Sequence, residues 1–273
     1  MNVINLLVFG NVLIALAAGF LTLSFSKLIG IDNYLLYGLM LFFGTLFTYN
    51  IQRLFRFKEI IESKSPRHQW IKNNKRIQYF ILFFAGLGAM ITFLYLVDNI
   101  KSLTLLLVIA LVSLIYAFRI NIKKRTFREL PYIKIHVIAI SWMFLAFVWP
   151  IVNSKIPFTM DNIRTCIAVY FYFIGITIPF DIRDLPYDLK NQKTIPQVLG
   201  IKKSKILAFA LLIMSAFLIV YTFKEALYNP FIYIAYGSQL TLLNKVSINS
   251  KELLFTGAID GSILFFGLFL FFQ

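Results

Sequence analysis

Apolar residues gather in nine runs along the chain, and shorter polar segments separate them. Most runs approach the roughly 20 residues that an α-helix needs to cross a bilayer, and they lack the alternation of a membrane β-strand. The runs lie near Val3–Phe25, Tyr34–Tyr49, Ile77–Val97, Leu103–Phe118, Ile135–Val152, Ile163–Phe180, Ile206–Phe223, Phe231–Leu243 and Leu253–Phe272. The pattern predicts an all-α polytopic membrane protein with nine transmembrane helices. The shortest runs must extend into their polar flanks or adjoin a broken helix.

The composition supports this prediction and excludes several other classes. Of the 273 residues, 59% are hydrophobic and only 14% are charged, whereas about 25% are charged in an ordinary soluble domain. The charged residues are bunched between the apolar runs, so a water-soluble globule is excluded. The one cysteine, Cys166, cannot form an intramolecular disulfide, and two histidines, His68 and His136, cannot build a His-rich metal site.

The positive charge is distributed unevenly over the two sides of the predicted membrane domain. The net charge is +15, which in a soluble protein would suggest a nucleic-acid partner. Here 22 of the 27 Lys and Arg residues fall in or beside the loops after the second, fourth, sixth and eighth runs. Because basic residues concentrate on the cytoplasmic side, the N-terminus is predicted in the cytoplasm and the C-terminus outside, with no nucleic-acid partner.

The organisation of the chain is that of one membrane domain over residues 1–273. The first run is too long for a signal peptide and lacks a basic segment before it, so we expect it to remain as a helix. No low-complexity tract or linker interrupts the pattern. The absence of a transit-type N-terminus favours a bacterial inner membrane over an organellar one.

The densest acidic cluster comprises Asp181, Asp184 and Asp188. Spacings of three and four place the carboxylates on one helical face, although Pro186 requires a kink or break before Asp188. Three converging negative charges are tolerated beside a membrane if a cation neutralises them, and carboxylate oxygens suit Mg²⁺. The alternative is a solvated loop in which the acids pair with nearby basic residues, namely Arg183, Lys190 and Lys193.

This segment resembles the second aspartate-rich motif of the UbiA superfamily of intramembrane prenyltransferases. The likeness includes Lys193-Thr194-Ile195-Pro196 and Leu199-Gly200, although the loop, with Asn191-Gln192, is shorter than is usual in the family. Nine helices, a cytoplasmic N-terminus and three long cytoplasmic loops extend the resemblance along almost the whole chain. It implies a UbiA-like helical bundle.

The resemblance also implies a reaction. A UbiA prenyltransferase transfers a prenyl group from a polyprenyl diphosphate to an aromatic or lipid acceptor within the membrane. Asp181, Asp184 and Asp188 would be the catalytic and metal-binding residues, and the Mg²⁺ that they hold would assist ionisation of the diphosphate. An aromatic-rich cavity would take the prenyl chain and exclude water. The implied partners are the diphosphate donor, the hydrophobic acceptor and membrane lipids.

Further basic residues match the family's diphosphate-binding segments. Tyr116, followed by Lys124 and Arg125, is similar to the tyrosine and basic residues after the fourth helix, and Lys193 belongs to the second motif. The resemblance implies that these side chains bind the donor. The alternative for each basic residue is the general excess of positive charge on the cytoplasmic side.

The first aspartate-rich motif of the family is absent. At the end of the second run only Asn50 matches, and the three acidic positions are replaced by Ile51, Leu54 and Lys58. A metal arrangement with two aspartate motifs therefore cannot form from the same ligands. Glu59 and Glu62 lie too far downstream to replace them.

Two interpretations follow from this loss. Arg53 and Arg56, three residues apart, would bind the diphosphate oxygens directly through their guanidinium groups. Alternatively, the chain is a non-catalytic UbiA-like membrane scaffold or lipid-binding protein. The complete second motif favours the enzyme, because three clustered acids beside a membrane are costly without a cation. His68 as a proton acceptor and Asp260 as an intramembrane acid are weaker candidates and are not assigned to catalysis.

Overall fold

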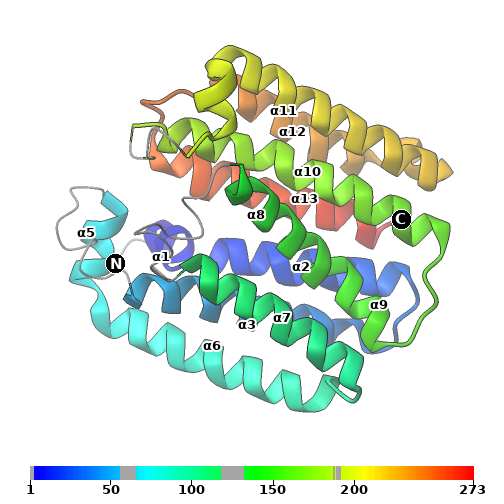
Figure 1. Cartoon of the computed structure of the whole chain (residues 1–273). Helices are drawn as coiled ribbons and strands as arrows, with labels where there is room; N and C mark the ends of the chain where they lie inside the picture. Colours follow the sequence, from blue (N-terminus) through cyan, green and yellow to red (C-terminus); the bar gives the residue numbers. More distant parts are fainter. Residues whose placement is uncertain (1–2, 56–65, 118–131, 187, 189–191) are drawn as a thin grey trace.

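The computed structural model describes residues 3–55, 66–117, 132–186, 188 and 192–273. Figure 1 shows helices running roughly side by side in one bundle, and no strand occurs in these ranges. The α-helices are α1 (Val3–Phe9), α2 (Val12–Leu28), α3 (Tyr34–Phe55), α5 (Pro66–Asn73), α6 (Lys75–Leu96), α7 (Ile100–Ala117), α8 (Ile133–Met143), α9 (Trp149–Asn153), α10 (Met160–Asp184), α11 (Ile195–Thr222), α12 (Pro230–Lys245) and α13 (Asp260–Phe271). Two segments are π-helical, η2 (Phe144–Val148) and η4 (Leu254–Ile259), and one is a 3₁₀-helix, η3 (Lys224–Tyr228).

Several of these helices are long and apolar enough to cross a membrane. Within the described ranges there are six, and the bent pair α1 and α2 would make a seventh. The six are Tyr34–Leu54, Lys75–Leu96, Ile133–Asn153, Met160–Asp184, Ile195–Thr222 and Leu254–Phe271. The all-α polytopic class is therefore confirmed. The other two predicted runs also form helices, α7 and α12, but neither is among the six, so the count of nine spans is not reproduced by length and hydropathy.

One short predicted run extends into its polar flank. The apolar pattern ends near Tyr49, whereas α3 continues to Phe55. The added turn contains Arg53, which is only 9% exposed. A buried guanidinium requires hydrogen-bond acceptors, and α1 and the break before α2 supply them, as described below.

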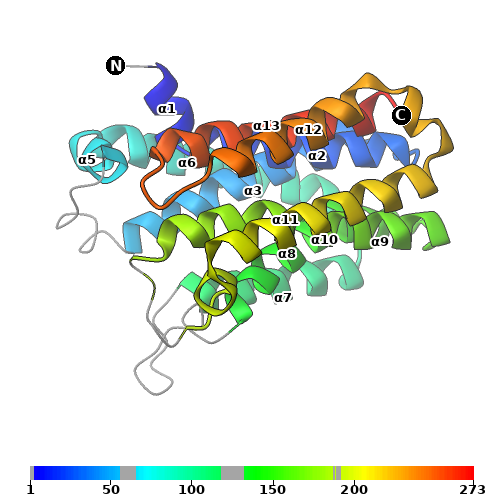
Figure 2. The ribbon, with the colours of Figure 1, turned by 90° about the horizontal axis from the view of Figure 1, so that it is seen from above.

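Helix α10 is the central element of the bundle. In its most apolar window 78% of the residues are buried, against 22–50% in the other five spans. It packs against α8 and α11, and Figures 1 and 2 show these helices beside it from two directions. Midway along α10, Tyr172 packs against Tyr236 and Phe266, with ring centroids 5.7 and 4.7 Å away. The last turn of α10 is thereby held inside the bundle, at the end where α8 and α11 begin.

Helices α2 and α3 pack closely through two glycines. A Cβ atom at Gly19 would lie 2.7 Å from the carbonyl oxygen of Gly38, and one at Gly38 would lie 2.9 Å from that of Gly19. Backbone atoms cannot move aside as a flexible side chain can. Small residues at such crossings let membrane helices approach each other closely, so this pair sets the α2–α3 distance.

We predict that Gly19→Ala destabilises the protein although alanine favours helix. The added methyl overpacks the crossing, and such changes typically cost about 1–3 kcal/mol. Gly44→Ala in α3 is the matched control, since a Cβ there meets nothing within 4 Å and should be neutral or stabilising by up to about 1 kcal/mol. Thermal unfolding of the two variants in one detergent measures the difference. Equal stability would contradict the steric role of Gly19.

Candidate functional site

The three aspartates lie at the end of α10 as the spacing predicted. Asp181 and Asp184 are in its last turn, and the helix ends at Asp184. Just beyond it, the backbone N–H of Asp188 donates to the carbonyl of Asp184 at 2.9 Å. The break that Pro186 required before Asp188 is confirmed. All three carboxylates remain close together across it.

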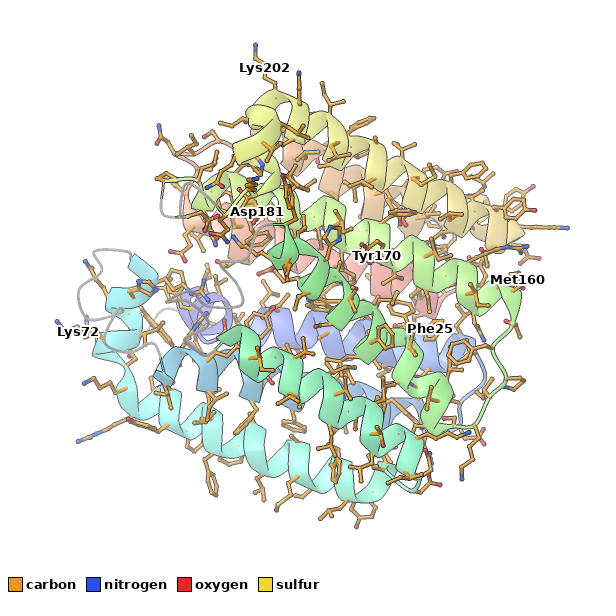
Figure 3. All side chains as sticks on the ribbon, viewed as in Figure 1. Phe25, Lys72, Met160, Tyr170, Asp181 and Lys202 are labelled. Carbon is orange, nitrogen blue, oxygen red and sulfur yellow. The ribbon has the colours of Figure 1, made fainter. Side chains whose placement is uncertain are left out.

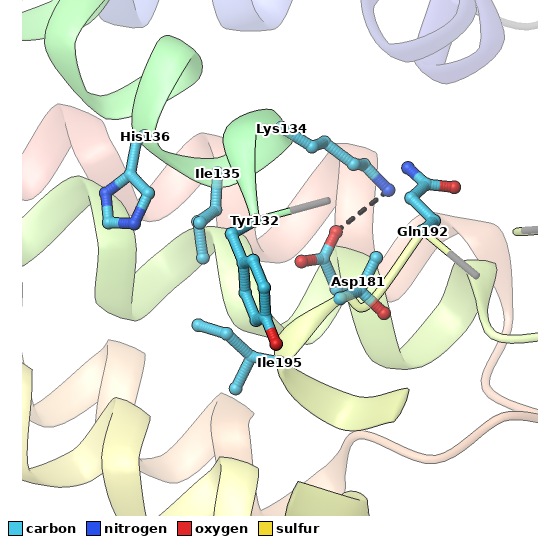
Figure 4. Close-up of a pocket in the computed structure, with 8 residues that line it drawn as sticks. Tyr132, Lys134, Ile135, His136, Asp181, Gln192 and Ile195 are labelled. Atoms are coloured by element: carbon cyan, nitrogen blue, oxygen red, sulfur yellow. Dashed lines mark ion pairs between the residues drawn. The ribbon is translucent and has the colours of Figure 1, made fainter. Parts of the chain in front are cut away.

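The side chain that joins them is Lys134, in the first turn of α8. Its Nζ lies 2.8 Å from Oδ1 of Asp181 and 3.3 Å from Oδ2 of both Asp184 and Asp188. The Lys134 side chain is 6% exposed and that of Asp181 is 1% exposed; Figure 4 shows the ion pair between them. One buried ammonium group therefore binds all three carboxylates.

A second cation reaches the cluster from α10 itself. Arg183 donates from Nε to Oδ1 of Asp184 at 2.8 Å, and its guanidinium also lies over the rings of Phe180 and Phe255. Both cations stand at the carbonyl end of α10, where positive charge is favourable. The ion pairs between described side chains thus join three carboxylates to two basic groups.

The sequence analysis missed Lys134 and expected other partners for the acids. Of the three basic residues considered, Arg183 pairs with Asp184, Lys190 lies outside the described residues, and Lys193 is exposed with a left-handed backbone (φ 51°). Lys134 is 50 residues from Asp184, so local spacing could not reveal the pair. The available signal was a lysine between two isoleucines at the start of an apolar run, where a charge needs an internal partner.

A small cavity adjoins the cluster. Its volume is about 40 Å³, enough for a water molecule or small ion. Figure 4 shows the residues around it, namely Tyr132, Lys134, Ile135, His136, Asp181, Gln192, Thr194 and Ile195. One of them, His136, is hydrogen-bonded through Nδ1 to the hydroxyl of Tyr170 at 2.7 Å. A diphosphate is larger than this cavity and would have to displace side chains to enter it. The predicted aromatic cavity for a prenyl chain stays a prediction.

The carboxylates offer the oxygen atoms that Mg²⁺ prefers, but they are arranged for a larger cation. Mg²⁺ binds oxygen at about 2.0–2.1 Å, whereas these oxygens surround an ammonium nitrogen at 2.8–3.3 Å. Within the described ranges, no three His, Cys, Asp or Glu side chains are arranged to hold a metal ion. The donor atoms fit Mg²⁺ chemically if Lys134 withdraws and the carboxylates close by about 1 Å.

A second cluster of polar side chains lies at the end of α3, where the family's first motif would lie. Asn50 donates to the carbonyls of Gly10 and Leu46 at 3.1 and 2.7 Å. Arg53 donates to the carbonyl of Phe9 and to Oδ1 of Asn11. These contacts bridge the 63° bend between α1 and α2, where Asn11 is left-handed (φ 62°). The two predicted donor-binding residues therefore stabilise this bend.

Arg67 of α5 connects this group with the rest of the same end. Its Nη2 lies 3.4 Å from Oδ1 of Asn11, and its Nη1 lies 3.4 Å from Oε1 of Glu252. Burial lowers the pKa of Arg67, while the neighbouring Glu252 opposes that shift. Arg67 also interacts electrostatically with Arg183 and Asp260. The α1–α2 bend, the last helix and the aspartate cluster thus belong to one continuous polar region.

The remaining predicted donor-binding residues are only partly placed. Tyr116 lies in the last turn of α7, but its side chain is outside the described residues, as are Arg56, Lys124 and Arg125. Figure 3 places Asp181, Lys72 and Lys202 toward the same end of the bundle, opposite Met160. Direct binding of a diphosphate by any of these residues stays a prediction.

Comparison with solved structures decides the fold. This chain superposes on the structure of a UbiA homolog from Archaeoglobus fulgidus bound to GPP and Mg²⁺, with a TM-score of 0.64 over 99% of this chain and 100% of that one. The chain has the UbiA fold. The sequences are 14% identical. No family model and no curated protein matches the sequence. The UbiA fold therefore persists here without detectable overall sequence similarity, and the resemblance drawn from the second motif is confirmed at the level of the fold.

We predict that Arg53→Ala destabilises the protein by about 2–4 kcal/mol, because it leaves buried acceptors of the α1–α2 bend without their charged donor. Arg164→Ala is the matched control at the opposite end. Arg164 pairs with the exposed Asp161, so its loss should change stability by less than about 0.5 kcal/mol. Chemical denaturation in detergent micelles compares them. An Arg53→Ala protein as stable as the control would show that Arg53 is free to serve a ligand instead.

Proposed function

We propose that this protein is an integral membrane prenyltransferase that uses a polyprenyl diphosphate as donor and a hydrophobic aromatic or lipid molecule as acceptor. The observation that carries the proposal is the convergence of Asp181, Asp184 and Asp188 on one cation position at the end of the most buried helix. The solved homolog with the same fold binds GPP and Mg²⁺. A diphosphate and its counter-cations are the ligands that such a charged site would take.

In the proposed reaction, the bond between the allylic carbon and the bridging oxygen of the donor breaks, and its electron pair leaves with the diphosphate. The acceptor forms the new bond to that carbon and releases a proton. Lys134 and Arg183, the basic groups of the cluster, would stabilise the leaving negative charge. When bound, Mg²⁺ would neutralise the diphosphate as a Lewis acid. The surrounding apolar helices would keep water from the reacting carbon.

The site would face the cytoplasm. Asp181 lies toward the same end of the bundle as Lys72 and Lys202 (Figure 3), which belong to two of the Lys- and Arg-rich loops of the sequence. The positive-inside rule supports an N-terminus in the cytoplasm and a C-terminus outside. The membrane we propose is a bacterial inner membrane. A donor made in the cytoplasm would reach the aspartates from water, and its prenyl chain would enter between the helices.

The second candidate is a non-catalytic membrane scaffold or lipid-binding protein. It is favoured by one specific observation: the end of α3 carries no aspartates of a first motif, and Asn50 and Arg53 stabilise a bend instead. Such a protein would retain the fold but bind no donor. The two candidates therefore differ in a direct binding measurement.

We predict that the purified protein binds radiolabelled farnesyl diphosphate in the presence of Mg²⁺, and that Asp184→Asn weakens this binding at least about tenfold. A tenfold loss corresponds to about 1.4 kcal/mol, within the range for removing one charged partner. Asp161→Asn is the control, because this exposed acid at the other end pairs only with Arg164 among the described side chains. Equilibrium binding in detergent or nanodiscs gives all three affinities.

The outcomes separate the two candidates. Specific binding that Asp184→Asn abolishes and Asp161→Asn preserves would support the prenyltransferase and justify an acceptor screen. No binding by a folded wild-type preparation would favour the scaffold. Binding that survives Asp184→Asn unchanged would remove the aspartate cluster from the donor site.

A further inference from the structure

We propose that Lys134 is the resident cation of the aspartate cluster and prevents a divalent metal from binding there until a diphosphate draws its ammonium group away. The inference rests on the proposed function and deepens it. Under this proposal a metal binds to the aspartates only after the diphosphate donor has bound. The protein without donor would hold its three aspartates together with an internal charge and no metal.

The first argument is that the two cations need the same position. Nζ of Lys134 lies within 3.3 Å of a carboxylate oxygen of each aspartate. A metal bound by all three would have to stand at the same centre, since its oxygen distances are shorter still. The side chain is buried, so the ammonium cannot simply share the site with a hydrated ion. Occupation by one cation excludes the other.

The second argument is the balance of charge. The ammonium of Lys134 neutralises one negative charge at the centre of the three carboxylates. Its removal makes the cluster more negative by one charge, which strengthens the attraction for a divalent ion. Arg183 differs from Lys134, because its ion pair is with Asp184 at the edge of the cluster and its side chain is 24% exposed. The lysine is therefore the group that sets the metal affinity of the cluster.

The third argument is that a diphosphate can remove this block. A lysine ammonium is a compact charge on a flexible stem and binds phosphate oxygens well. The small cavity beside Lys134 and Asp181 shows that the space next to the ammonium is not completely filled. A diphosphate is larger than this cavity, so it would displace neighbouring side chains, bind Nζ and thereby release the three carboxylates to the metal. By thermodynamic linkage, donor and metal must then each raise the affinity for the other.

Mn²⁺ binding, followed by electron paramagnetic resonance on purified protein without donor, tests the inference. The variant is Lys134→Met, which keeps the length of the side chain and removes the charge. The matched control is Lys155→Met, whose lysine forms a 3.3 Å ion pair with Asp98 in an exposed region. We expect wild type and Lys155→Met to bind Mn²⁺ no better than Asp184→Asn does. Lys134→Met should bind one Mn²⁺ at least about tenfold more tightly, and the added Asp184→Asn substitution should abolish the gain.

Thermal stability gives a second readout that needs no activity. Lys134→Met should unfold at a lower temperature than wild type in EDTA, because its buried carboxylates repel one another, and Mn²⁺ should restore much of the loss. The unfolding temperature of wild type should change little on addition of EDTA or Mn²⁺. A folded Lys134→Met protein that gains no Mn²⁺ affinity would overturn the inference.

Wild-type protein keeps the test decisive even if Lys134→Met does not fold. Mn²⁺ binding should appear on addition of geranyl diphosphate and be absent without it. Tight Mn²⁺ binding by donor-free wild type, lost in Asp184→Asn, would overturn the inference. Failure of folded wild type to bind geranyl diphosphate would contradict the proposed function instead, and the donor-free comparison of Lys134→Met with wild type would still decide the role of Lys134.

Discussion

A buried charge needs a partner of opposite sign, and this requirement determines the architecture of the charged end of the bundle. Three carboxylates at the end of α10 surround the ammonium of Lys134 at 2.8–3.3 Å. Removal of the ammonium or of a carboxylate alone would leave an uncompensated charge where water is scarce. Such a loss typically lowers the free energy of unfolding by about 3–5 kcal/mol. The start of α8 is thus fixed against the end of α10. The most buried helix of the molecule is locked at the position where the chemistry is proposed.

The need for a partner also explains the polar contacts around the bend between α1 and α2, at the same end of the bundle. Arg53 and Arg67 are basic residues in an apolar bundle, and each finds oxygen acceptors at the bend between α1 and α2 or at Glu252. The chain resembles UbiA prenyltransferases in its second motif, but the end of α3 has none of the acids of the first motif. Arg53 gives this end of α3 a positive charge instead. The proposed donor would accordingly meet more positive charge and fewer metal ligands on that side.

The sequence predicted much of this structure because its strongest signals are local. Apolar runs of helix length revealed the all-α membrane class, and the spacing of Asp181, Asp184 and Asp188 placed three carboxylates together. Lys134 could not be found in this way, since its partners are brought near it only by the packing of α8 on α10. Asn50 and Arg53 were identified by a motif position, whereas their contacts depend on a bend after Phe9 that hydropathy does not show.

The bend between α1 and α2 bears on how the protein is made. Its polar groups are satisfied by Asn11, Asn50 and Arg53, all within the first quarter of the chain, so they can pair while the ribosome is still synthesising the rest. Arg67 differs, because its carboxylate partner Glu252 is 185 residues away. Until the segment that carries Glu252 is made, Asn11 can accept a hydrogen bond from Arg67 but no carboxylate can pair with it. The charged contacts of this end of the protein are therefore completed only when its final segment is in place.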